Sequence, residues 1–158
     1  MSKENYFILK PFGPSIVKLK IPENLVDKLN AYVDKVISDK KKSSELDYSK
    51  QLAGMVTQEF KLEQKFMEEV GWGRFLGNAC QKWIEIVYKK KISKFEISSS
   101  WIVRQFQNEY NPTHWHGGHI SGAGFLKVPK SLGESTQQKK SKKYRGGNLQ
   151  LIHGARMF

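Results

Sequence analysis

Three of the four histidines in this chain lie within the stretch NEYNPTHWHGGHISGAGF, residues 108–125. They are His114, His116 and His119. Side chains at i and i+2 of a strand point to the same face, so His114 and His116 can lean toward one ion while Trp115 points into packing. His119 follows two glycines, where the chain can turn back toward that ion or away into solvent. The spacing favours a metal site, although histidines beside glycine and proline also occur in ordinary loops.

The type of metal follows from the available ligands. Structural zinc sites usually draw on cysteine, and the only cysteine, Cys80, lies elsewhere in an apolar helical pattern where we expect buried packing. An imidazole site with open positions suits non-haem iron at least as well. A single cysteine also excludes an intrachain disulfide, which fits a reducing compartment.

The first half of the chain is predicted to be mostly helical. Residues 5–13 and 15–22 read as two short strands around a Gly13–Pro14 turn. Pro22 opens an amphipathic helix whose apolar positions continue to Ile37, and residues 39–44 read as a polar loop. Residues 51–70 hold short ordered pieces, and a second long helix is predicted from Gly73 to Lys90.

The second half changes to a period of two. Residues 95–107 (FEISSSWIVRQFQ), 120–129 (ISGAGFLKVP) and 147–154 (GNLQLIHG) are strand candidates, with a lysine-rich loop at 133–147. Helices first and strands second indicate an α+β fold with an antiparallel sheet or barrel. The length of 158 residues indicates a single domain.

The net charge and the apolar pattern indicate which classes of partner to expect. The net charge of +12 attracts anions, whether nucleic acid or a small dicarboxylate, and equally suits solvated lysines that keep the protein in solution. No apolar run is long enough to cross a membrane and the N-terminus is not a signal peptide, so we expect no membrane partner and a cytoplasmic location.

The stretches NEYNPTHWHGGHISGAGFLKVP and GGNLQLIHGAR together resemble the Fe(II)- and 2-oxoglutarate-dependent dioxygenases. The resemblance is in particular to the small oxygenases of bacteria and marine phages, and the prolyl hydroxylases are similar more distantly. Leu52–Gly54 (LAG) and Ser100-Trp101 are also similar to that group, so the resemblance covers roughly residues 50–158. It implies a double-stranded β-helix (jelly-roll) core with supporting N-terminal helices.

The resemblance also implies the chemistry. Fe(II) is the cofactor, 2-oxoglutarate and O2 are co-substrates, and the product is a hydroxylated C–H bond of a prolyl or other protein side chain, or of a small molecule. A phage-encoded enzyme would act in the host cytoplasm. His114 is the implied first ligand, with His116 second and His119 favoured as third. The residues proposed around the metal are Tyr110, Arg104 and Lys127 for the co-substrate, and Phe106, Trp115 and Phe125 for the substrate pocket.

Two departures from the family pattern are visible. His116 stands where the wider superfamily carries Asp or Glu, so either the site uses histidines only or a nearby group such as His119 or Glu109 completes it. The family's distal histidine and its basic residue for 2-oxoglutarate come later than Phe158, so we expect a domain over 1–158 that lacks its closing strands.

The alternatives are a basic nucleic-acid-binding protein and a metal-binding jelly roll without oxygenase activity.

Overall fold

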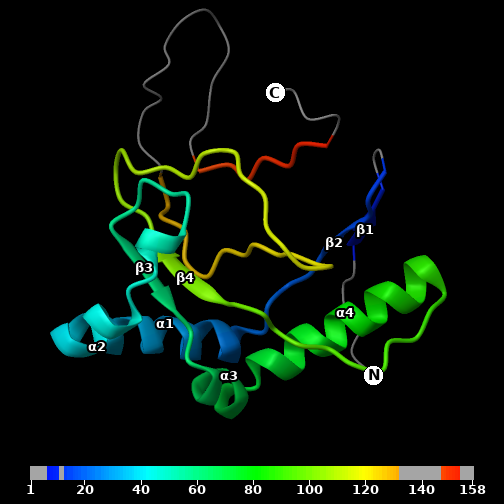
Figure 1. The fold of residues 1–158 in the computed structure, drawn as a ribbon, viewed down its shortest axis with the longest axis horizontal. Helices are drawn as coiled ribbons and strands as arrows, with labels where there is room; N and C mark the ends of the chain where they lie inside the picture. The colour runs from blue at the N-terminus through cyan, green and yellow to red at the C-terminus, as the bar shows by residue number, and fades with distance from the viewer. Residues whose placement is uncertain (1–6, 11–12, 132–146, 154–158) are drawn as a thin grey trace, which may run out of the picture. The chain divides into compact units, whose positions relative to one another are not determined.

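The computed structural model describes residues 7–10, 13–131 and 147–153 (Figure 1). The chain divides into two compact units, Lys20–Leu126 and a smaller one formed by Met1–Leu19 with Lys127–Phe158. The described residues form an α+β structure with two small antiparallel sheets, which confirms the predicted mixed class. They contain no closed barrel.

The smaller unit begins with the predicted hairpin. Strand β1 (Phe7–Leu9) pairs antiparallel with β2 (Ile16–Lys18). At Gly13 a Cβ would lie 2.9 Å from Nε2 of His153, so the turn and the described C-terminal stretch pack closely. The strands predicted at 120–129 and 147–154 are wrong over their described residues, which are irregular and mostly exposed. The lysine-rich loop at 133–147 lies almost entirely outside the described residues.

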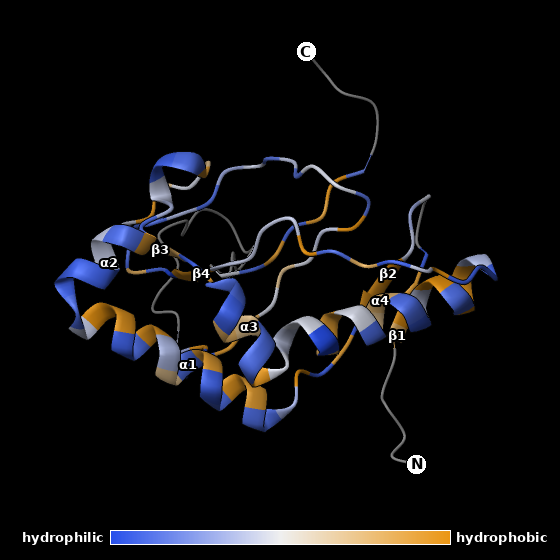
Figure 2. Cartoon of the chain, turned by 60° about the horizontal axis from the view of Figure 1, so that its bottom comes forward, coloured by the Kyte–Doolittle hydropathy of each residue, from blue (hydrophilic) through white to orange (hydrophobic). Residues whose placement is uncertain are grey.

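Helix α1 (Glu23–Ser38) opens the larger unit, as predicted. It begins where the carbonyl of Pro22 accepts hydrogen bonds from the N–H groups of Leu25 and Val26. Its apolar stripe repeats at three and four residues and is buried, while its charged face stays in solvent. Figure 2 shows this alternation as bands along α1 and α4. The buried residues of the stripe are Leu25, Leu29, Tyr32, Val33 and Val36.

The polar loop predicted at 39–44 is wrong, because Lys40–Leu46 form helix α2. Asp39 explains the difference: its carboxylate accepts hydrogen bonds from the N–H groups of Lys41 and Lys42 at 3.0 Å and caps the helix. Lys40 and Lys41 are therefore exposed residues of a short helix, and Lys42 pairs with Glu63 at 2.7 Å. A 3-10 turn, Ser49–Gln51, follows.

Strand β3 (Gln58–Lys61) and strand β4 (Trp101–Arg104) form the second sheet. Only the middle of the strand predicted at 95–107 is therefore a strand. Between them lie helix α3 (Gln64–Val70) and helix α4 (Trp72–Tyr88), the latter close to its predicted bounds. Gly71 joins the two helices with φ +80, a left-handed conformation that glycine adopts without a Cβ clash.

The β3–β4 sheet has two faces with different roles. Phe60 and Ile102 are opposite each other in the register, and both pack into the core formed by α1, α3 and β3. Glu59 and Val103, and Lys61 and Trp101, are the neighbouring opposed pairs and therefore project from the other face. Helices thus cover one face of this sheet. On the other face, Trp101 contacts His116, so this face carries the histidine segment, the stretch that contains His114 and His116.

Candidate metal centre

His114 and His116 lie on an irregular segment and not on the strand that the sequence predicted. Pro112 has no N–H for a strand ladder, and Gly118, with φ +90, ends any extended run. Trp115 is 79% exposed, so its predicted packing is also wrong. The two imidazoles nevertheless meet, with ring centroids 4.8 Å apart.

The hydrogen bonds of His114 direct its ring. Its Nδ1 lies 2.7 Å from the carbonyl oxygen of Pro112, and a carbonyl can only accept, so Nδ1 carries the proton. The Nε2 atom of neutral His114 is therefore left with a lone pair. This Nε2 lies 2.8 Å from Nε2 of His116.

That separation fits two ligands of one octahedral ion. Two nitrogens bound at about 2.1 Å and at right angles are about 3.0 Å apart, from the usual metal–imidazole bond length. The fixed Nδ1–H of His114 is the arrangement that metal-ligating histidines commonly show. In the absence of an ion, His116 can donate its Nε2–H to the lone pair of His114. The separation therefore suits two ligands of one divalent cation.

Aromatic side chains support the pair from the sheet. The ring of Trp101 meets His116 edge-on, with centroids 5.5 Å apart. Tyr48 also lies close to Trp101, at 6.0 Å between ring centroids. Since Trp101 projects from the face opposite the helical core, the imidazoles lie over the same face as Glu59.

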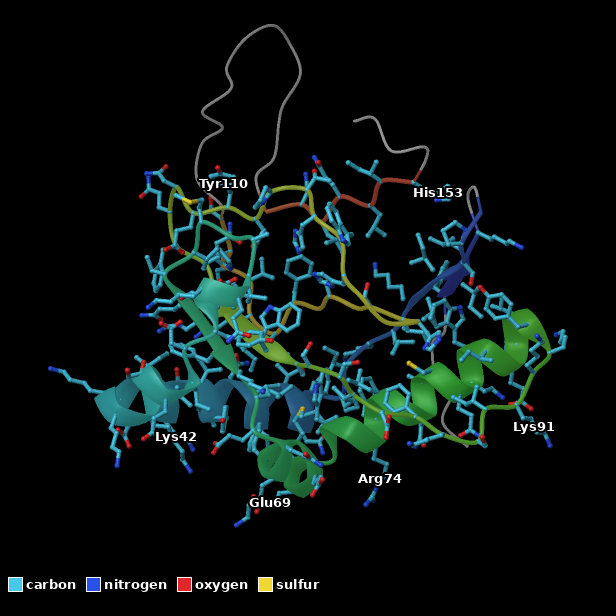
Figure 3. The ribbon with its side chains drawn as sticks, in the orientation of Figure 1. Lys42, Glu69, Arg74, Lys91, Tyr110 and His153 are labelled. Carbon is cyan, nitrogen blue, oxygen red and sulfur yellow. The ribbon has the colours of Figure 1, made fainter. Side chains whose placement is uncertain are left out.

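Two long-range contacts hold the segment that precedes His114. The backbones of Met55 and Tyr110 exchange hydrogen bonds of 2.8 and 3.4 Å. Next to them, a Cβ on Gly54 would overlap with Oδ1 of the Asn111 side chain. The LAG motif thus ends in a glycine because the histidine segment passes directly against it. Tyr110 itself lies on the side of the sheet away from α1 (Figure 3).

The candidates for a third ligand are His119 and Glu109. His119 is exposed and forms no hydrogen bond or ring contact within the described residues, so its role stays a prediction. Glu109, the alternative, already accepts hydrogen bonds from Thr57 and from the N–H of Phe106 through its two carboxylate oxygens. Across the described part of the chain, no three His, Cys, Asp or Glu side chains are arranged to hold a metal ion.

The residues predicted around the metal are only partly brought together. Arg104 projects from the helix-covered face, donates a 2.8 Å hydrogen bond to Gln58 and lies over the ring of Phe106. The imidazoles lie over the other face, and the co-substrate role of Arg104 stays a prediction. Lys127 is exposed and belongs to the smaller unit, so its role stays a prediction. Phe125, like Phe106, is about half exposed or more, and both remain predicted pocket residues.

Sequence reasoning missed Glu59, which is 1% exposed. Its Oε2 atom is buried and has no hydrogen-bond partner. Burial raises the pKa of Glu59, the negative charges of Asp47 and Glu109 raise it further, and His114 lowers it. The only signal in the sequence was the alternation of Val56, Phe60 and Leu62, which places Glu59 on the opposite face but does not show that this face is covered.

The fold and the site define an α+β protein with a paired-imidazole centre beside a sheet. No family model matches the sequence, and neither a curated protein nor a solved structure shows significant similarity to it. In the described ranges, no helix has the length and apolar character needed to cross a bilayer.

Proposed function

We propose that this protein binds a divalent metal ion through His114 and His116 and that it is an Fe(II)- and 2-oxoglutarate-dependent dioxygenase. The observation that carries the proposal is the 2.8 Å separation of the two Nε2 atoms, with Nδ1 of His114 fixed by Pro112. The resemblance of residues 50–158 to that superfamily supplies the choice of metal and co-substrate. The substrate in this proposal is a C–H bond of a prolyl or other protein side chain, or of a small molecule.

The chain's own residues prepare the site in three ways. The carbonyl of Pro112 selects the tautomer of His114 that presents a lone pair at Nε2. The edge of Trp101 limits rotation of the His116 ring. The net charge of +12 raises the local concentration of the dianionic co-substrate. Iron, when bound with 2-oxoglutarate, supplies the activation of O2 that hydroxylation requires.

The fold part of the proposal concerns the β3–β4 sheet. We assign these strands to the double-stranded β-helix that the resemblance implies. Two features support this assignment: the strands are antiparallel, and N-terminal helices cover one face while the imidazoles lie over the other. The supporting role of α1 agrees with the family's arrangement of helices.

The test uses the purified protein without oxygen. Addition of Fe(II) and 2-oxoglutarate is expected to give a weak visible charge-transfer band, and admission of O2 is expected to yield succinate. His114→Ala and His116→Ala should each lower metal affinity by about a hundredfold or more, since each removes a direct ligand. His153→Ala is the matched control, because His153 lies in the smaller unit. A metal-loaded wild-type protein without the band contradicts the dioxygenase assignment.

Two alternatives predict different results. A metal-binding protein without oxygenase activity would lose metal in the same variants but release no succinate. A nucleic-acid-binding protein, favoured by the net charge, would bind random oligonucleotides with an affinity that falls steeply as salt rises. Binding that is unchanged between low and high salt removes the nucleic-acid alternative.

A further inference from the structure

Apart from Glu109, the proposed cation site has no negatively charged candidate ligand. Two neutral imidazoles leave both charges of a divalent ion uncompensated, and Glu109 is engaged by Thr57 and Phe106. A carboxylate close to the pair would favour the cation. Strand β3 carries a carboxylate, Glu59, on the sheet face over which the imidazoles lie.

Glu59 has the position this role requires. It projects from the same sheet face as Trp101, whose ring contacts His116. His114 lies close enough to Glu59 to lower the pKa of its carboxyl, although burial, Asp47 and Glu109 together raise that pKa above its ordinary value. Its Oε2 atom is buried and unpartnered, although buried polar atoms in folded proteins nearly always have a partner.

The cost of this arrangement argues against a purely structural role. An unpaired carboxylate oxygen in the interior destabilises a fold, and Asp47 and Glu109 add like charge nearby. No described residue donates to Oε2, so it contributes no hydrogen bond that would offset the burial. Proteins keep an unpartnered buried polar group chiefly at functional sites, where a bound ligand can supply the missing partner.

We propose that Glu59 is the anionic partner of the cation held by His114 and His116, acting through its charge from beneath the pair. It is not assigned as a coordinating ligand, because no three such side chains in the described ranges have ligand geometry. With Asp47 and Glu109 it forms a local acidic centre in a chain that is otherwise strongly basic, and such a centre favours a cation. The proposal rests on the metal-binding part of the proposed function and not on the 2-oxoglutarate chemistry.

The experiment compares Glu59→Gln with wild type and with Glu69→Gln. Glutamine keeps the shape of the side chain and removes the charge. Glu69 is an exposed carboxylate on α3, paired only loosely with Lys65 at 4.0 Å, and it lies at the end of the unit opposite Tyr110 (Figure 3). The probe is Co²⁺ alone, and its binding is monitored by its visible absorption during a titration. Thermal unfolding is measured separately for the metal-free proteins.

Glu59→Gln is expected to weaken Co²⁺ binding by roughly tenfold to a hundredfold, the range seen when groups behind metal ligands are removed. The same substitution is expected to raise the unfolding temperature of the metal-free protein, because the buried charge is gone. Glu69→Gln should change neither value. The opposite signs of the two effects distinguish a site residue from a structural one.

Unchanged Co²⁺ affinity in Glu59→Gln overturns the inference, and so does a lower unfolding temperature, which would show that the carboxylate stabilises the fold. If Glu59→Gln does not fold, Glu59→Met is measured in its place, and failure of both variants counts as the structural outcome. Failure of the proposed function is a distinct result. In that case Glu59→Gln still weakens Co²⁺ binding, but the wild-type protein with Fe(II) and 2-oxoglutarate gives no charge-transfer band and no succinate.

Discussion

Thr57 and Glu109 are 52 residues apart in the chain and are joined by two hydrogen bonds. One carboxylate oxygen of Glu109 accepts from the hydroxyl of Thr57 at 2.6 Å and from its N–H at 3.0 Å. These hydrogen bonds lower the pKa of Glu109, together with one from the N–H of Phe106. They fasten the segment leading to His114 onto the start of β3, so the imidazole pair depends on a contact that neither histidine makes.

Loss of this contact should loosen the metal site. Glu109→Ala and Thr57→Val are both expected to lower Co²⁺ affinity, by roughly tenfold for the former, because the histidine segment loses its anchor. Competition titration with a chelator measures the effect. Glu69→Ala is the control with an exposed carboxylate. If Glu109 were itself a metal ligand, Thr57→Val would leave the affinity nearly unchanged while Glu109→Ala abolished binding.

Gly54 gives a steric prediction at the neighbouring contact. A Cβ at residue 54 would overlap with the Asn111 side chain and lie 3.1 Å from Val56, so Gly54→Ala should destabilise the protein by about 1–3 kcal/mol through overpacking. Denaturant unfolding measures the loss. Asn111→Gly in the same chain removes the overlapping atom and should recover part of the stability. Equal losses in the single and double variants would contradict the steric explanation.

Glu63 gives a prediction about pH. Its carboxylate accepts from Tyr32 at 2.7 Å and pairs with Lys42 at 2.7 Å, which joins α1 and α2 to the start of α3. The hydrogen bonds from Lys42 and then Tyr32 lower the pKa of Glu63 below its ordinary value. A lowered pKa means that the charged form stabilises the fold above the ordinary pKa and that this stabilisation is lost as pH falls through the lowered one.

The unfolding free energy of wild type should therefore fall relative to Glu63→Gln between about pH 5 and pH 3. At neutral pH, Lys42→Met should cost about 0.5 kcal/mol, because the pair is partly exposed and screened by solvent. Chemical denaturation across this pH range provides the measurement. Parallel curves for wild type and Glu63→Gln would contradict the assigned role of the carboxylate.

The core gives a prediction about packing. Leu29 is 1% exposed and lies in the cluster that joins α1 to the sheet, so Leu29→Ala should destabilise the protein by about 3 kcal/mol through the cavity it leaves. Leu151, which is 65% exposed, is the matched control, and Leu151→Ala should change stability by less than about 0.5 kcal/mol. Urea unfolding followed by circular dichroism compares the two. A similar loss in both variants would contradict the assignment of the core.

Short-range information was sufficient for the two long helices. The three- and four-residue spacing of apolar positions predicted α1 and α4 close to their observed bounds, since a helix buries one stripe wherever its partner lies. The hairpin of β1 and β2 followed in the same way from two apolar runs around a turn. The clustering of His114 and His116 was also visible, because two residues at i and i+2 cannot be far apart.

Long-range contacts decided the rest. Residues 120–129 alternate like a strand but have no pairing partner among the described residues, and a strand exists only where another backbone accepts its hydrogen bonds. The orientation of His114 depends on Pro112 and that of His116 on Trp101, a residue from β4. Glu59 is 1% exposed on the sheet face from which Trp101 contacts His116, and the neighbouring Thr57 is hydrogen-bonded to Glu109, 52 residues later. Burial is a property of the assembled chain, so no local pattern could have marked this carboxylate.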